Sequence, residues 1–81
     1  MGENKVAVIA ILVENYDSVE RVNSLLHDFR EYIVGRLGIP YKTRNVSVIS
    51  VVLDATGEII NSLSGKLGMI NGVSAKVLQT K

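Results

Sequence analysis

The sequence predicts an α+β fold of the ferredoxin-like βαββαβ type, in which a four-stranded antiparallel sheet carries two helices on one face. Four short segments are rich in valine and isoleucine, as strands are. Two segments between them repeat apolar residues at helical spacing. Their order along the chain is strand, helix, strand, strand, helix, strand, which is the order of this plait. A length of 81 residues suits a single domain over residues 1–81.

The first strand is expected at residues 5–13, where both alternating faces are apolar. Asp17, with Glu20 three positions later, fits a capping box and predicts a helix that runs to about Glu31. The apolar residues of this helix fall on one arc of the helical wheel, namely Val19, Val22, Leu25, Leu26 and Phe29. The sequence therefore predicts that one stripe of this helix packs on the sheet.

The second strand is expected at residues 32–39 and is irregular at Gly35 and Gly38, since glycine inside a strand usually marks a bulge or a close approach. Its apolar residues fall at even spacing, as Ile33, Leu37 and Ile39, with Gly35 in the same row. Pro40 removes a hydrogen-bond donor, which suits a strand end or a sheet edge. We therefore expect a hairpin connection over residues 40–45.

The clearest strand covers residues 46–54, where most positions are aliphatic. Asp54 or Thr56 is expected to cap a second helix over about residues 56–67. Gly68 follows that helix, where a left-handed residue commonly closes the C-terminus.

The last strand, at residues 73–79, completes a sheet that has more apolar surface than two helices can cover. The strand at 5–13 is apolar on both faces, and the strand at 46–54 nearly so. The solvent face of an antiparallel sheet is normally polar. Because an apolar patch on a monomer usually marks an interaction surface, we predict a homo-oligomer, either a homodimer or a tetramer.

The composition of the chain indicates its cellular compartment and argues against several kinds of site and partner. The chain has no cysteine, which excludes disulfides and thiolate metal sites and suits the cytoplasm. The longest apolar run, residues 6–13, is far shorter than the roughly 20 residues of a membrane span, and no leader segment is evident. The net charge of +1 implies nothing about nucleic acid, but the lack of aromatic residues in the central strands argues against direct nucleic-acid binding by this chain.

Few residues could carry chemistry. With one histidine and no cysteine, the sequence offers no catalytic constellation, no metal centre and no cofactor motif, so no enzyme is predicted. His27 and Glu31 would share a helix face as a metal pair, but a solvated surface histidine is the favoured interpretation. Gly35 and Gly38 are not followed by a helix, so a phosphate-binding loop is disfavoured.

A ligand site is conceivable in the loop after the first strand. Asn15, Tyr16 and Asp17 combine polar side chains with a helix N-terminus, which would hold a small polar molecule. The alternative, which we favour, is a capped loop whose tyrosine packs on a neighbour. Whether Arg36 and Tyr41 also contact a neighbouring subunit stays open at this point.

Four segments carry a resemblance that covers nearly the whole chain: VENYDSVERVNSLLHDF, YIVGRLGIPY, VSVISVVLDA and LSGKLGMINGVSAKV. Together they resemble the iron-only hydrogenase system regulators, small stand-alone ACT-like proteins similar to the C-terminal domain of the nickel-responsive regulator. The resemblance implies an ACT-like fold, an oligomer and a regulatory role linked to iron-only hydrogenase. It implies no mechanism.

The sequence differs from related domains in residues that those domains use to bind amino acids or nickel, so these functions are not expected from the resemblance. ACT domains that bind amino acids usually have a glycine after the first strand, and residues 14–20 contain none. The nickel-responsive domain uses histidines and a cysteine for its metal, whereas this chain has only His27 and no cysteine, so nickel sensing is not expected. No DNA-binding segment precedes residue 5, so any contact with DNA is expected through a partner chain.

Two hypotheses follow. The first is a non-enzymatic regulatory or interaction module that acts as a homo-oligomer and contacts a protein partner. The alternative is an ACT-type sensor that binds a small polar metabolite, its effector, at subunit interfaces through Asn15, Tyr16 and Asp17.

Overall fold

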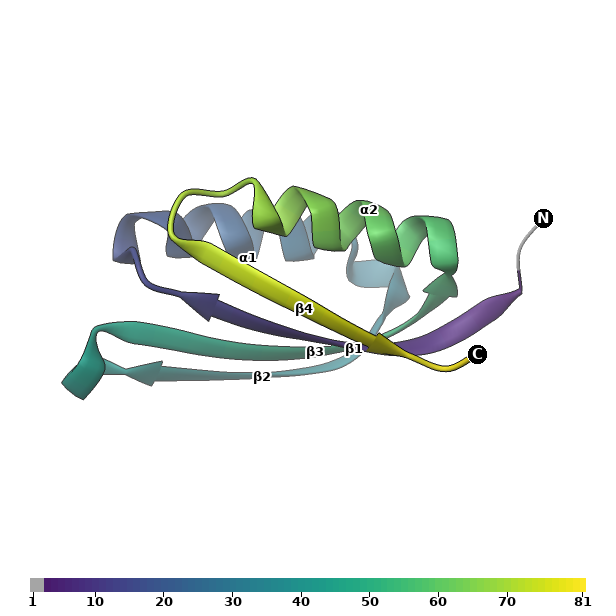
Figure 1. Cartoon of the computed structure of the whole chain (residues 1–81), viewed down its shortest axis with the longest axis horizontal. Coiled ribbons are helices and arrows are strands. Elements are labelled where there is room, and N and C mark those ends of the chain that lie inside the picture. The colour runs from purple at the N-terminus through teal and green to yellow at the C-terminus, as the bar shows by residue number, and fades with distance from the viewer. Residues whose placement is uncertain (1–2) are drawn as a thin grey trace.

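A computed structural model describes residues 3–81 and contains one antiparallel sheet with two helices on the same side (Figure 1). The strands lie in the order β2-β3-β1-β4. The elements in chain order are β1 (Asn4–Val13), α1 (Val19–Asp28), β2 (Ile33–Tyr41), β3 (Val46–Thr56), α2 (Gly57–Gly68) and β4 (Val73–Gln79). This arrangement confirms the predicted ferredoxin-like plait.

The core lies between the sheet and the helices. Strand β1 is central and pairs with β3 on one side and β4 on the other, so alternate residues of all three point toward the helices. The fully buried aliphatic side chains of β1, β3, α1 and α2 are Ile9, Ile11, Val13, Val51, Leu53, Val22, Leu26, Ile60, Leu63 and Leu67. The predicted apolar stripe of α1 therefore packs on the sheet, with Val22 and Leu26 at its centre.

The other side of the sheet carries no helix, and we call it the open face (Figure 1). Its residues occupy the alternate positions of the strands that point away from the core. They are Val6, Val8, Ala10, Leu12, Gly35, Leu37, Ile39, Tyr41, Val46, Val48, Ser50, Val52, Asp54, Ser74, Lys76 and Leu78.

A bulge in β2 decides which of its residues reach the open face. Ile33 pairs with Leu53, but Gly35 pairs with Val52, so β2 has one extra residue at Val34. Each inserted residue moves all later side chains to the other side of a strand. The predicted irregularity is confirmed, but the single row of Ile33, Leu37 and Ile39 is wrong. Ile33 packs against the core, whereas the later two lie on the open face.

Strand β2 also extends further than the sequence indicates. It includes Pro40 and ends at Tyr41, and the turn Lys42–Arg44 is closed by the left-handed Asn45, at φ 53°. Proline is tolerated because β2 is an edge strand and has only one hydrogen-bonded neighbour. The predicted edge position of Pro40 is confirmed.

The start of α1 differs from the predicted capping box. Asp17 lies inside a short 3-10 helix, Tyr16–Ser18, and α1 itself begins at Val19. The side-chain oxygen of Asn15 accepts a hydrogen bond from the backbone N–H of Asp17 at 3.0 Å. Asn15 thus caps the 3-10 helix that leads into α1, and its Asx turn leaves Asp17 within that 3-10 helix.

The C-terminal ends of both helices also differ from the prediction. Helix α1 ends at Asp28, and Glu31 lies in a separate 3-10 turn, Arg30–Tyr32. Helix α2 includes Gly68 in helical conformation, so the predicted left-handed closure there is wrong. The left-handed glycine is Gly72, at φ 76°, because the chain reverses just before β4.

Thr56 rather than Asp54 caps α2, since its hydroxyl accepts from the backbone N–H of Ile59 at 3.4 Å.

Replacement of a core leucine tests the packing of α2 on the sheet. Leu63 is fully buried, so Leu63→Ala is expected to lower the free energy of unfolding by about 2–5 kcal/mol in urea titrations. Met69 follows the same helix and is 86% exposed, so Met69→Ala serves as the control and is expected to change stability by less than about 0.5 kcal/mol. Equal losses in the two variants at one protein concentration contradict this core.

Candidate functional site

The loop predicted to bind a ligand is held by internal hydrogen bonds. The side-chain oxygen of Asn15 accepts from Asp17, and its backbone carbonyl accepts from the N–H of Ser18 at 2.9 Å. The N–H of Glu14 donates to the carbonyl of Gly72 at 2.8 Å. Asn15 therefore stabilises the junction between β1 and α1.

This loop is also tied to the turn before β4. The buried hydroxyl of Ser18 donates to the backbone carbonyl of Asn71 at 2.6 Å. A Cβ added to Gly72 would lie only 2.7 Å from the Cβ of Asn15. The two connections, the β1–α1 loop and the α2–β4 turn, are thus packed against each other. Only a glycine fits at position 72.

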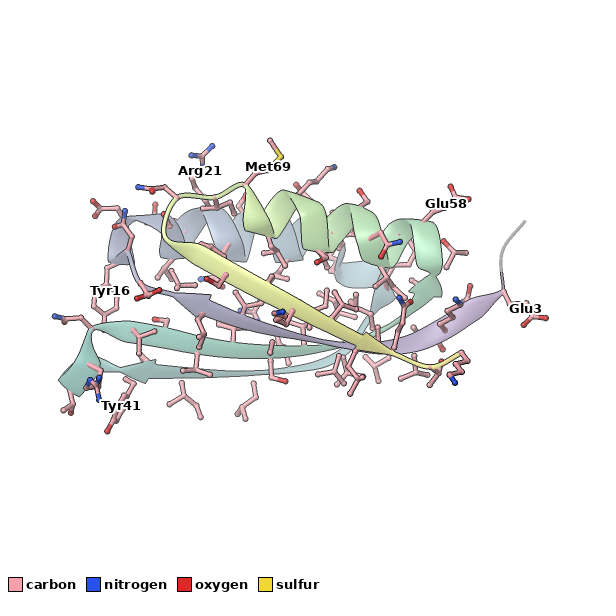
Figure 2. The ribbon with its side chains drawn as sticks, viewed as in Figure 1. Glu3, Tyr16, Arg21, Tyr41, Glu58 and Met69 are labelled. Carbon is pink, nitrogen blue, oxygen red and sulfur yellow. The ribbon has the colours of Figure 1, made fainter. Side chains whose placement is uncertain are left out.

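Tyr16 and Asp17 are exposed beside Asn15, and Tyr16 lies at the same end of the molecule as Tyr41 (Figure 2). The three hollows described below are lined by other residues. A ligand role for Asn15, Tyr16 and Asp17 stays a prediction.

The open face is an apolar surface that extends across all four strands. Rows of neighbouring residues cross the sheet, as the strand register defines. One row contains Ile39, Val48, Leu12 and Ser74, and another contains Gly35, Val52, Val8 and Leu78. Side chains project from this side in Figure 2, with Tyr41 among them.

Polar residues on the open face are few. The row between the two apolar ones consists of Leu37, Ser50, Ala10 and Lys76. Asp54 lies beyond them at the far end of β3. At the centre of this row, Ser50 and Ala10 have smaller side chains than their neighbours in the two adjacent rows.

A hollow of about 370 Å³ lies at the hairpin end of the open face. It is lined by Leu12, Glu14, Tyr41, Arg44 and Val46. It combines apolar walls with one acidic and one basic residue. Tyr41 thus reaches a part of the surface where a neighbouring chain could contact it.

A second hollow, which we call the Arg36 hollow, lies on the helix side between α1 and the strands β2 and β3. It measures about 220 Å³ and is lined by Val19, Asn23, Arg36, Gly38, Ile39, Pro40, Ser47 and Ile49. A side-chain N–H of Arg36 donates to the amide oxygen of Asn23 at 2.8 Å. Sequence reasoning missed this hollow because it placed Gly35 and Gly38 in an irregular strand without the register that turns Arg36 and Gly38 toward α1.

A third hollow of about 310 Å³ lies between the helices. Its lining is Arg21, Ser24, Leu25, Asp28, Lys66 and Ile70. The ammonium of Lys66 lies 5.5 Å from the centre of the Phe29 ring, within cation–π range. This contact accounts for the position of Lys66 by packing alone.

The structure gives no support to a metal pair at His27. Helix α1 ends at Asp28, so His27 and Glu31 do not share a helix face. The backbone carbonyl of His27 accepts from Arg30 at 3.0 Å. Within residues 3–81, no three His, Cys, Asp or Glu side chains gather as a metal site would require. In the same residues, no helix has the length and apolar character needed to cross a bilayer.

Comparison with known proteins agrees with this fold. The model of the TM1266-like family, described as iron-only hydrogenase system regulators, matches residues 5–77. Among solved structures, the uncharacterized protein TM1266 from Thermotoga maritima is 38% identical, with a TM-score of 0.92 over 98% of this chain and 100% of that one. No curated protein matches.

Substitution of glycine tests the contact between the two connections. Gly72→Ala combines an unfavourable positive φ with a clash against Asn15, so we expect a loss of about 1–3 kcal/mol in the free energy of unfolding. The matched control is Gly65→Ala in α2, where a new Cβ meets nothing within 4 Å. That variant should gain about 0.5–1 kcal/mol. A Gly72→Ala variant as stable as the Gly65→Ala variant would disprove the tight approach.

Proposed function

We propose that this chain, which belongs to the TM1266-like family of iron-only hydrogenase system regulators, performs its regulatory role as a homo-oligomer assembled through the open face. The observation that carries the proposal is the aliphatic character of a sheet face that no helix covers. We propose further that the role is not catalytic, on the basis of the regulatory description of the family, and that it is performed in the cytoplasm through a protein partner.

The composition of the open face supports the assembly. The water-facing side of an antiparallel sheet normally alternates polar residues with the buried ones. Here, the corresponding positions of the central strand β1 are Val6, Val8, Ala10 and Leu12. Leu37, Ile39 and Leu78 extend the apolar surface to both edge strands, and Leu78 is 77% exposed. Covering a surface of this kind with another apolar surface lowers the free energy, because apolar area is removed from water.

The size of the open face suits an interface between two copies. Four strands about 4.8 Å apart, each contributing about seven residues at about 3.3 Å, give a projected area of about 450 Å². The accessible area of such a corrugated surface is larger than its projection. An ordinary stable interface takes about 800 Å² from each partner. The whole face, rather than one edge of it, is therefore required.

The shape of the open face supports packing against itself. The small residues Ser50 and Ala10 are flanked by the larger side chains of Leu12 and Val52. Two such faces related by a two-fold axis that passes beside the middle row place larger side chains of one copy over the small residues of the other. Sheets that pack in this way lie about 10 Å apart, with their strands rotated by about 30°.

Lysines placed on the open face test the assembly. We expect the wild-type chain at micromolar concentration to have two or four times its 8.8 kDa mass in size-exclusion chromatography with light scattering. The Val8→Lys/Leu12→Lys variant should elute at the mass of one chain, because it buries two ammonium groups in the interface. Met69→Lys places one lysine on an exposed apolar residue away from the open face and should keep the wild-type mass.

A wild-type chain of 8.8 kDa, or a double variant with wild-type mass and circular dichroism, contradicts the assembly. The functional consequence is measured in cells that lack the natural gene. Wild type and Met69→Lys should restore the level of iron-only hydrogenase activity, and the double variant should not. Full restoration by a folded, monomeric double variant removes the oligomer from the proposal.

A further inference from the structure

We infer that the Arg36 hollow is a binding site for a short aliphatic carboxylate that carries a hydrogen-bonding oxygen at its far end, such as a 4-oxo or 4-hydroxy acid. The hollow lies on the helix side of the sheet, away from the proposed assembly surface. The inference therefore does not depend on the homo-oligomer.

The bulge at Val34 creates the hollow. It places Arg36, Gly38 and Pro40 on the helix side of β2, as their pairing with Val51, Ile49 and Ser47 defines. Gly38 has no side chain, and a Cβ built there meets nothing within 4 Å. The space beside α1 thus stays open in the middle of the strand, between a charged residue at one end and a proline at the other.

The polar groups at one end of the hollow are donors. Arg36 has five N–H donors, and a single hydrogen bond, to Asn23, is recorded for its side chain within residues 3–81. That bond orients the guanidinium toward α1, and it leaves the amide N–H₂ of Asn23 as a further donor. No acidic side chain lines the hollow. A carboxylate is the group that a guanidinium fork binds best at this size.

Ser47 supplies the second, independent observation. It is only 7% exposed, it lines the hollow, and no hydrogen bond between its hydroxyl and another described residue is recorded. No side-chain oxygen of the described residues is both fully buried and without a partner, so this hydroxyl is reached from the space of the hollow. Since Ser47 pairs with Pro40, it lies about 13 Å along the strand from the backbone of Arg36. An oxygen at the far end of a ligand would accept the hydrogen bond of this hydroxyl.

The apolar lining and the volume of the hollow limit the size and the chemical character of the middle part of the ligand. Val19, Pro40 and Ile49 provide apolar contact. A volume of about 220 Å³ is below the about 300–1,000 Å³ of sites for larger ligands. An α-amino acid is disfavoured, because the hollow has no carboxylate for its ammonium group and the Asn23 oxygen already accepts from Arg36. A short unbranched acid therefore fits best.

Nuclear magnetic resonance titration of the full chain with levulinate (4-oxopentanoate) tests this site. We expect saturable shifts of the amide signals of Arg36, Gly38 and Ser47. Pentanoate, which lacks the keto oxygen, should bind about threefold more weakly. Levulinamide, which lacks the charge, should bind about tenfold more weakly. Inorganic phosphate should bind more weakly than levulinate, because it has no apolar body for the walls.

Two pairs of variants locate the binding. Arg36→Gln should weaken levulinate binding about tenfold, whereas Arg44→Gln removes the same charge from the same hairpin outside the hollow and should have less than about a twofold effect. Gly38→Val fills the hollow and should abolish the saturable shifts. Gly35→Val adds the same side chain to the open side of β2, also with no atom within 4 Å, and should retain binding.

Several results would overturn the site. These are shifts that do not saturate, phosphate binding as tight as levulinate binding, no shift at Ser47, or unchanged affinity in a folded Gly38→Val variant. The Val8→Lys/Leu12→Lys variant separates this inference from the proposed function. It should bind levulinate as the wild type does, even where it no longer assembles, and a loss of binding by the folded variant contradicts a site contained within one chain.

Discussion

The extra residue at Val34 is the constraint on which both proposed functional surfaces of this protein depend. Because side chains alternate along a strand, one inserted residue exchanges the two sides of β2 from Gly35 onward. Leu37, Ile39 and Tyr41 thereby reach the open face and continue the apolar surface of β1 and β3. The same shift turns Arg36 and Gly38 toward α1. A charged residue and a gap then lie where a regular strand would place aliphatic side chains against the helix.

Much of the fold could be predicted from local pattern. The element order, the last strand and the apolar stripe of α1 follow from spacing and β-propensity, which act within one segment. The excess of aliphatic residues on the open face also follows, since both faces of residues 5–13 are apolar. What could not be predicted depends on contacts between segments. Asn15 replaces Asp17 at the cap, and Gly72 rather than Gly68 is left-handed, because the β1–α1 loop packs on the turn before β4.

The Arg36 hollow could not be predicted for the same reason. Polar residues after the first strand made Asn15, Tyr16 and Asp17 a candidate ligand site beside the favoured capped loop, and in the structure Asn15 holds the β1–α1 loop against the turn before β4. The Arg36 hollow is built from α1, β2 and β3, and its residues are far apart in the chain. No short motif contains them. Only the register of β2 against β3 brings Arg36, Gly38 and Ser47 to one side.

The cover of the open face by a second copy is measured most directly by the solvent paramagnetic relaxation of methyl groups in the wild-type chain. If the face is covered, the methyls of Val8 and Leu12 are expected to relax as slowly as those of the buried Leu63, while the exposed Met69 methyl relaxes fast. If Val8 and Leu12 relax as fast as Met69, the open face meets water, and the account of this protein as an assembly through its sheet is contradicted.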